Sequence, residues 1–250
     1  MGKLKIVLPL MPLLLPCITA ATTAVAVRTA NLVIISVDSK PSFPVSDGKV
    51  HPSVVSKVHQ KGQVVFAICG FDNDPNQGGV HIQEVIANSF EEADPFSLKV
   101  SKTEDAVTMA VLQEVHALEQ RGDQKQLDFM VNQPFVTGFV FAEYSDGVPH
   151  LSARLFRVAL QSSSPKITAT MDKVACGDEK NPICYAGPNI GGVSKVFASV
   201  PDPVRATRTV VENDIRDFEE SVGPPVITVV VDRTGVHCYG VPNCQLKDSD

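Results

Sequence analysis

The sequence predicts an α+β fold in which two mainly antiparallel sheets stack face to face, with helices on both outer faces. The first reason is that β-branched apolar runs come in groups rather than alternating singly with helices, which argues against a Rossmann-like sheet. The second is that these runs are apolar enough to need cover on both faces. The third is size, because 250 residues with 44% hydrophobic and 20% charged side chains describe one large globular domain.

The first strands form a predicted hairpin. Thr22–Val27 and Leu32–Val37 alternate or cluster β-favouring residues and are separated by a short turn. Asp38 follows the second strand directly. After a proline-containing loop, Gln63–Cys69 is predicted as a third strand that ends at Gly70.

Helices and further strands follow in order. Helical spacing of apolar residues predicts helices over Ile82–Ala93 and Thr103–Arg121, the second capped by Thr103 and stopped by Gly122. The helices around Val85 and Val111 are expected on one outer face and the helix around Val211 on the other. The remaining predicted elements are strands Phe135–Tyr144, Leu151–Leu160 and Lys166–Val174, helix Pro203–Ser221, and a closing hairpin of Val226–Val231 and Val236–Tyr239.

Residues 1–21 have the layout of a secretory signal peptide. Lys3 and Lys5 precede the apolar run Ile6–Leu15, and the small residues Thr19-Ala20-Ala21 offer a cleavage site before Thr22. The run is short and interrupted by proline, so no stable membrane insertion is expected, although an uncleaved anchor is the alternative. We therefore expect a secreted or periplasmic protein whose single domain is 22–250.

The cysteines suit an exported protein. Cys17 would leave with the signal peptide, and the close pairs Cys176–Cys184 and Cys238–Cys244 are predicted disulfides. Cys69 lies in an apolar run and is predicted to be a buried free thiol. The alternative is that all five remaining cysteines are ordinary small residues. Neither pair has the spacing of a zinc site, so no metal and no cofactor are expected.

Charge and motifs exclude several functional classes. The net charge is −6 and no basic patch stands out, so nucleic acid is not an expected partner. The sequence contains no nucleotide-binding P-loop, no G-x-S-x-G and no H-E-x-x-H. The histidines are scattered, and each is better explained as a surface or structural residue.

The residues behind the predicted cleavage site carry a resemblance. Thr22-Thr23 leads into the hairpin that ends on Asp38, Lys57-Val58 follows, and the next strand ends in Cys69-Gly70. This ordered set resembles the proteasome β subunits and their bacterial relative, which are N-terminal-nucleophile (Ntn) hydrolases. It is specific from about residue 22 to 74, and the later element order also agrees. The resemblance implies a four-layer αββα fold and cleavage of peptide or amide bonds.

The resemblance also implies roles. Thr22 would be the nucleophile, and its free α-amino group, with a pKa near ~8, would be the base. Lys57 would tune that amine and stabilise negative charge, and Asp38 would hold Lys57 in place. The Gly70 N–H would belong to the oxyanion hole, and the backbone of Ser42 would pair with an extended substrate.

Several points stay open at the level of sequence. Lys61 is an alternative to Lys57, and Pro188 stands where the family has a serine near the catalytic amine. Only Glu219 and Ser221 are offered where the family has an Asp and a Ser before its last strands. The alternatives to a threonine peptidase are a non-catalytic binding or assembly protein of the same fold and an amidase acting on small molecules. The resemblance also raises a homo-oligomeric ring.

Overall fold

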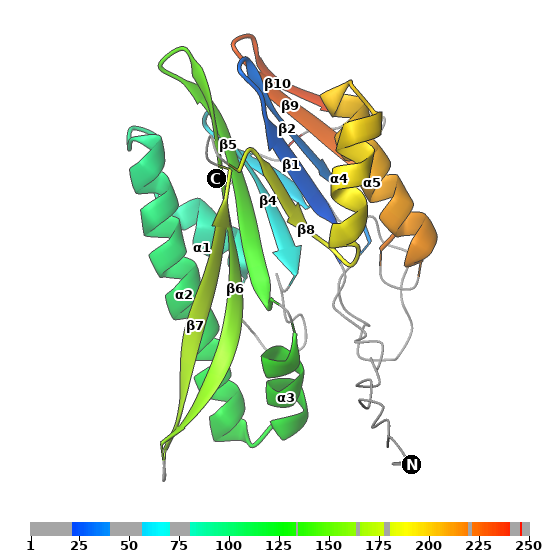
Figure 1. The fold of residues 1–250 in the computed structure, drawn as a ribbon. Helices are drawn as coiled ribbons and strands as arrows, with labels where there is room; N and C mark the ends of the chain where they lie inside the picture. The colour runs from blue at the N-terminus through cyan, green and yellow to red at the C-terminus, as the bar shows by residue number, and fades with distance from the viewer. Residues whose placement is uncertain are drawn as a thin grey trace, which may run out of the picture.

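The computed structural model describes residues 22–40, 57–70, 81–133, 135–163, 166–177, 181–219, 222–240 and 246. These residues form two five-stranded antiparallel sheets and five helices (Figure 1). The prediction of an α+β chain with two antiparallel sheets is therefore confirmed.

Sheet A has the N-terminal hairpin at its centre. Its strand order is β10-β9-β2-β1-β8. The strands are β1 (Ala24–Arg28), β2 (Leu32–Val37), β8 (Ile183–Ala186), β9 (Ile227–Asp232) and β10 (Gly235–Tyr239). β1 pairs with β2 in the register that sets Ala24 opposite Val37. β1 therefore begins and β2 ends at the same edge, where Thr23 and Asp38 lie.

Sheet B is a meander with the order β3-β4-β5-β6-β7. Its strands are β3 (Val58–Lys61), β4 (Val64–Gly70), β5 (Thr137–Ser145), β6 (Val148–Ser163) and β7 (Lys166–Cys176). Asp146 and Gly147 make the turn between β5 and β6, both with positive φ, 54° and 79°. That conformation fits a two-residue hairpin turn.

Small and β-branched side chains fill the space between the sheets. Ala24 and Ala26 from β1 lie in one buried cluster with Ala67 of β4 and with Ala142 and Ala153 of β5 and β6. Sheets packed face to face lie about 10 Å apart, and small inner side chains fit into that space. Lys57, just before β3, contacts Thr22 before β1 and Asp38 after β2, so the two sheets meet at this edge.

The outer face of sheet A is covered by two helices. They are α4 (Ile190–Ser199) and α5 (Pro203–Asp217). Val25, which points away from the inner core, shares a cluster with Val193 of α4 and with Val210 and Val211 of α5. Figure 1 shows both helices along this sheet.

Three helices share a core with sheet B. They are α1 (Ile82–Asn88), α2 (Phe96–Arg121) and α3 (Gln124–Asn132). Phe66, Phe139 and Phe141 from the sheet are buried together with Ile86 of α1 and Val111 of α2. The expected placement of the helices around Val85, Val111 and Val211 agrees with these contacts.

Three helix ends differ from the prediction. α2 begins at Phe96 after Pro95, seven residues before the predicted cap. Thr103 is instead buried inside the helix, where its hydroxyl lies 2.6 Å from that of Ser89. α1 ends at Asn88 rather than Ala93, because the Ser89 hydroxyl donates to the Ile86 carbonyl at 2.7 Å and closes the last turn. α5 likewise ends at Asp217 rather than Ser221.

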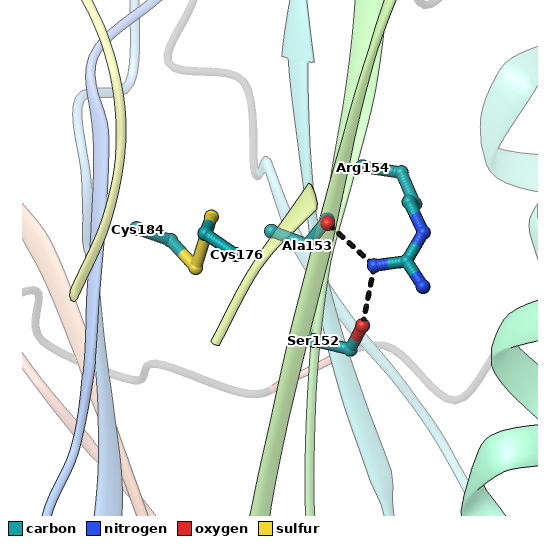
Figure 2. The surroundings of a disulfide bond; sticks show 5 residues. All are labelled: Ser152, Ala153, Arg154, Cys176 and Cys184. Carbon is teal, nitrogen blue, oxygen red and sulfur yellow. Dashed lines mark hydrogen bonds between the residues drawn. A yellow bond between two sulfur atoms is a disulfide. The ribbon is translucent and has the colours of Figure 1, made fainter. Parts of the chain in front are cut away.

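One predicted disulfide joins the two sheets at an edge. Cys176 at the end of β7 is bonded to Cys184 in β8, with Cα atoms 5.5 Å apart (Figure 2). These strands are the edge strands of sheets B and A. Cys69 is a buried free thiol, as predicted. Cys238 is also disulfide-bonded, but Cys244, its predicted partner, lies outside the described residues.

Within the described residues, no helix is long and apolar enough to cross a membrane.

Candidate active site

Thr22 and Thr23 directly precede β1, at the open end of the hairpin. The Asp38 N–H donates to the Thr23 carbonyl at 3.1 Å, and the Thr23 N–H donates to Asp38 Oδ1 at 2.9 Å. Both threonines are buried, with exposed fractions of 1% and 0%. The hairpin register thus sets two buried hydroxyl residues beside the carboxylate that ends β2.

The Asp38 carboxylate is buried and accepts four hydrogen bonds. Oδ1 accepts from Thr23 N and from Lys57 Nζ, the latter at 2.8 Å. Oδ2 accepts from the backbone N–H groups of Lys40 and Gly223, at 3.0 and 3.3 Å. A buried carboxylate is tolerated only when it is paired and hydrogen-bonded, and both conditions hold here. Asp38 is therefore a fixed anion that can hold a cation in place.

Lys57 is that cation. Its Nζ donates to Asp38 Oδ1 and also to Thr22 Oγ1, at 3.1 Å. The Ile68 N–H donates to the Lys57 carbonyl at 3.0 Å, which anchors the residue to β4 just before β3 begins. The lysine side chain is buried, so its ammonium lies in a region of low dielectric next to a threonine hydroxyl. The structure thus brings together three of the residues singled out from the sequence.

Lys61, the alternative lysine, lies elsewhere. Its Nζ donates to the carbonyls of Ala87 and Phe90, at 2.5 and 2.9 Å, at the end of helix α1. A cation is favourable at the carboxyl end of a helix. Lys61 therefore has a structural task on the outer side of sheet B and takes no part in this site.

Gly70 ends β4 with a positive φ of 82°. A Cβ built there would lie 2.5 Å from the Val136 carbonyl oxygen, so both backbone conformation and space require glycine. Its neighbour Cys69 lies close enough to Lys57 and Asp38 to be affected by their charges. Burial raises the pKa of the Cys69 thiol to about 12, so this thiol is neutral and serves as packing behind the site.

A second buried carboxylate, not singled out from the sequence, holds Thr23 from the other side. The Thr23 hydroxyl donates to Asp214 Oδ2 at 2.8 Å, and the Tyr185 hydroxyl donates to the same oxygen at 2.7 Å. Burial raises the pKa of the Asp214 carboxyl, while these two hydrogen bonds oppose the rise. Burial, and then the bond to Asp214, raise the pKa of Tyr185.

Tyr185 also organises the loop between β8 and α4. Its hydroxyl oxygen accepts the Asn189 N–H at 2.6 Å. Gly187 passes so close that an added Cβ would lie 2.6 Å from the tyrosine oxygen, so this loop position also requires glycine. The Tyr185 hydroxyl therefore holds the loop segment around Pro188. The same hydroxyl also links this loop to Asp214.

Several predicted residues lie outside the described part of the chain. They are Ser42, which was expected to pair with substrate, and Ser221. Glu219 is described, and its backbone carbonyl accepts from the Lys40 ammonium at 2.7 Å. Among the described residues, no group of three or more His, Cys, Asp or Glu side chains is placed to hold a metal ion.

The arrangement has a definite chemical capacity. An ammonium that touches a hydroxyl stabilises negative charge developing on that oxygen, and it lowers the pKa of any amine nearby. The carboxylate behind the ammonium keeps it charged and oriented. These are the requirements for a hydroxyl nucleophile, provided that a base is available to accept its proton.

No family model matches the chain, and no curated protein is significantly similar to it.

Proposed function

We propose that this protein is an N-terminal-nucleophile hydrolase resembling the proteasome β subunits, with the four-layer αββα architecture of that class. It would cleave peptide or amide bonds with Thr22 as the first residue of the mature chain. The observation that carries the proposal is the contact of one buried ammonium, Lys57 Nζ, with both Thr22 Oγ1 and Asp38 Oδ1. This contact joins the residue directly behind a predicted cleavage site to a fixed ion pair.

The mechanism starts with the base. Removal of residues 1–21 turns the Thr22 nitrogen from an amide into a free amine with a pKa near ~8, lowered further by the Lys57 ammonium. This amine takes the proton of the Thr22 hydroxyl as the oxygen attacks the carbonyl carbon of the substrate. The developing oxyanion is stabilised by the Gly70 N–H, in the role that the resemblance gives to it.

The second half of the reaction regenerates the enzyme. The ammonium form of the Thr22 amine gives its proton to the leaving amine, and the carbon–nitrogen bond breaks to leave an ester on Thr22. Water, deprotonated by the same amine, then attacks the ester carbonyl. The bond between the acyl carbon and Thr22 Oγ1 breaks, the amine returns its proton to that oxygen, and the carboxylic acid product leaves. Atoms and charges balance without any cofactor. A substrate backbone would pair with Ser42.

The Asp214 and Tyr185 pair supports the same reading. It fixes the hydroxyl of Thr23, while Asp38 fixes the N–H of that residue, so the chain one peptide unit beyond the nucleophile is held from both sides. Such fixation limits the movement of Thr22 and keeps its hydroxyl against Lys57, which is the kind of positioning on which catalysis depends.

The decisive experiment starts with the mature N-terminus. Intact mass and N-terminal sequencing of the exported protein should give Thr22 as the first residue. A hydroxyl-reactive inhibitor should then add one equivalent to wild type and none to Thr22→Ala, whose melting temperature should stay close to that of wild type. A mature chain that begins elsewhere, or full turnover by Thr22→Ala, would remove the proposal and leave a non-catalytic binding or assembly protein.

Location and assembly are part of the proposal. Export to an oxidising compartment is supported by the Cys176–Cys184 disulfide. A homo-oligomeric ring, as in the proteasome relatives, would give a native mass several times that of one mature chain. A monomer that hydrolyses small amides but not peptides would instead favour the amidase alternative.

A further inference from the structure

β8 is a short edge strand next to the candidate site. It has four residues, Ile183–Ala186, lies at the edge of sheet A and, among the described strands, pairs only with β1. A second attachment is the disulfide from Cys184 to Cys176, which joins β8 to the edge strand of sheet B (Figure 2). A short edge strand with few backbone hydrogen bonds opens at a low free-energy cost, so the position of β8 depends on this covalent bond.

Neighbouring residues of β8 carry the disulfide and a tyrosine of the site. Successive side chains of a strand point to opposite faces of its sheet. Cys184 accordingly belongs to the cluster between the two sheets, whereas Tyr185 packs against the cluster that sheet A forms with helices α4 and α5. A displacement of Cys184 on one face therefore moves the Tyr185 ring on the other.

Two hydrogen bonds and one peptide bond connect this tyrosine to the candidate nucleophile. The Tyr185 hydroxyl donates to Asp214 Oδ2 at 2.7 Å, and the Thr23 hydroxyl donates to the same oxygen at 2.8 Å. Thr23 is joined directly to Thr22, whose hydroxyl accepts from the Lys57 ammonium at 3.1 Å. The place of the Tyr185 hydroxyl therefore affects the place of the nucleophile.

The two bonded cysteines differ in exposure. Cys184 is only 3% exposed, whereas Cys176 is half-buried and lines a cavity of about 310 Å³ at the end of β7. Exchange between a thiol and a disulfide depends on access to the sulfur atom that is attacked. A small thiol that enters this cavity meets Cys176 first, so the bond is within reach of a reductant in the folded protein.

We propose that the Cys176–Cys184 disulfide is a redox switch of the candidate active site, an inference that rests on the proposed function. With the bond formed, β8 holds Tyr185 against Asp214 and the hydrolase is active. With the bond reduced, β8 leaves its place, Asp214 loses the tyrosine, and the nucleophile loses its alignment. A chain still in a reducing compartment would then be inactive, and activity would begin after export.

The reductant of the switch is a dithiol. One of its thiolates attacks the Cys176 sulfur, the bond between the two protein sulfurs breaks, and Cys184 leaves as a thiolate that takes up a proton. The second thiol of the reductant then attacks the mixed disulfide and releases Cys176 as a thiol. Two electrons pass from the reductant, which becomes a cyclic disulfide, to the protein, which gains two thiols.

The test compares the exported, cleaved chain before and after treatment with dithiothreitol under native conditions. On reduction kcat should fall at least about tenfold, because a small displacement of a catalytic group costs up to about 10²-fold in rate. It should recover when dithiothreitol is removed and the disulfide forms again. The double variant Cys176→Ser, Cys184→Ser should have the low kcat from the start and should not respond to dithiothreitol. A response that persists in this variant would assign the effect to the disulfide of Cys238 and overturn the proposal.

Lys99→Met is the matched control for a loss of stability. It breaks the buried pair of Lys99 and Glu143, with Nζ 2.9 Å from Oε1, between helix α2 and sheet B, and leaves β8 untouched. It should melt at a lower temperature than wild type but keep its kcat and its response to dithiothreitol. A fall in kcat as large as that of the double serine variant would mean that lower stability explains the effect, and would overturn the switch.

Hydrogen exchange gives a readout that does not depend on turnover. The Asn189 N–H donates to the Tyr185 hydroxyl at 2.6 Å, and the Arg28 N–H donates to the Pro182 carbonyl at 2.9 Å just before β8. Both amides should exchange at least about tenfold faster in the reduced protein, because β8 no longer protects them. An oxidised chain without turnover would refute the proposed function, and exchange would still decide whether the disulfide controls β8. Unchanged exchange at both amides, or an oxidised enzyme that keeps its kcat on reduction, would overturn the switch alone.

Discussion

The ion pair behind the candidate nucleophile gives the sharpest prediction. Lys57→Met keeps most of the length of the side chain and removes its charge. The variant leaves Asp38 completely buried and without its cation. It also takes away the only ammonium that touches the Thr22 hydroxyl in the described part of the chain.

The size of the effect follows from the bonds that remain. Removing one partner of a buried pair costs about 3–5 kcal/mol. Asp38 keeps three backbone N–H donors, so the low end, about 3 kcal/mol, is expected. For a domain of this size, that is a fall of about 6–12 °C in melting temperature. Turnover, if the proposed function holds, should fall by about 10²–10⁴-fold.

The assay is thermal unfolding of the exported protein by circular dichroism, with turnover measured beside it. Lys61→Met is the matched control, because Lys61 is a lysine of β3 whose ammonium donates to the Ala87 and Phe90 carbonyls and lies over the Phe90 ring, away from this site. It should lose about 1 kcal/mol and keep its turnover. A Lys57→Met protein that melts within about 2 °C of wild type would refute the buried ion pair.

Three further predictions concern other parts of the site and fold. Gly70→Ala should cost more than about 2 kcal/mol, whereas Gly122→Ala, at a φ of 69° but in open space, should cost about 1 kcal/mol by denaturant unfolding. Replacing Cys176 and Cys184 by serine should cost about 2.5 kcal/mol, because the disulfide closes a short loop of sequence separation 8. The folded pKa of Asp214 is raised, so the wild type must bury a charge as pH rises from the unfolded pKa of an aspartate, about 3.9, through that folded pKa. Asp214→Asn, which stays neutral, should gain in stability relative to wild type over this pH range.

Each of these has a clear opposite. Equal losses at the two glycines would mean that the contact with the Val136 carbonyl does not constrain Gly70. An unchanged unfolding midpoint in the serine variant would show that the sheet edges do not need their cross-link. A stability difference between wild type and Asp214→Asn that is flat from pH 3 to 7 would contradict the raised pKa of Asp214.

Most of the strands and their grouping could be predicted because their signals are local, whereas the two four-residue strands β3 and β8 were not predicted. Leu32–Val37 is a run rich in β-branched residues with the same bounds in the structure, and Asp146-Gly147 supports the turn conformation observed. Two helices were missed for physical reasons. α4 starts with Gly191 and Gly192 in its first turn, which lowers its helix propensity, although Asn189 caps it through the Gly192 N–H at 3.1 Å.

The other missed helix shows the limit of a stop signal. Gly122 does end α2 in a left-handed conformation, but Asp123 then accepts the Gln126 N–H at 3.1 Å and starts α3. A helix-capping residue such as Asp123, directly after the glycine that ends one helix, indicates that a second helix begins there. Asp123 is therefore a local signal for α3 that the sequence itself carries.

The candidate site was only partly visible in the sequence. Thr22, Asp38 and Lys57 could be singled out by their order, because the hairpin brings two of them together. Asp214 could not be found in that way, since its contact with Thr23 spans 191 positions of sequence. Its one local signal is a charged residue at helical spacing from Thr207, Val210 and Val211, on the buried face of α5.

The burial of the two threonines also bears on whether cleavage comes before or after folding. A soluble protease must accommodate several extended residues around the bond that it cuts, and Thr22 and Thr23 are almost wholly covered. If the bond before Thr22 is cut by an external peptidase, the cut has to come while the emerging chain is still unfolded. Once β1 has paired with β2 and β8, Thr22 and Thr23 are covered, so we expect a precursor that folds first to be cut by its own chemistry or to stay uncut.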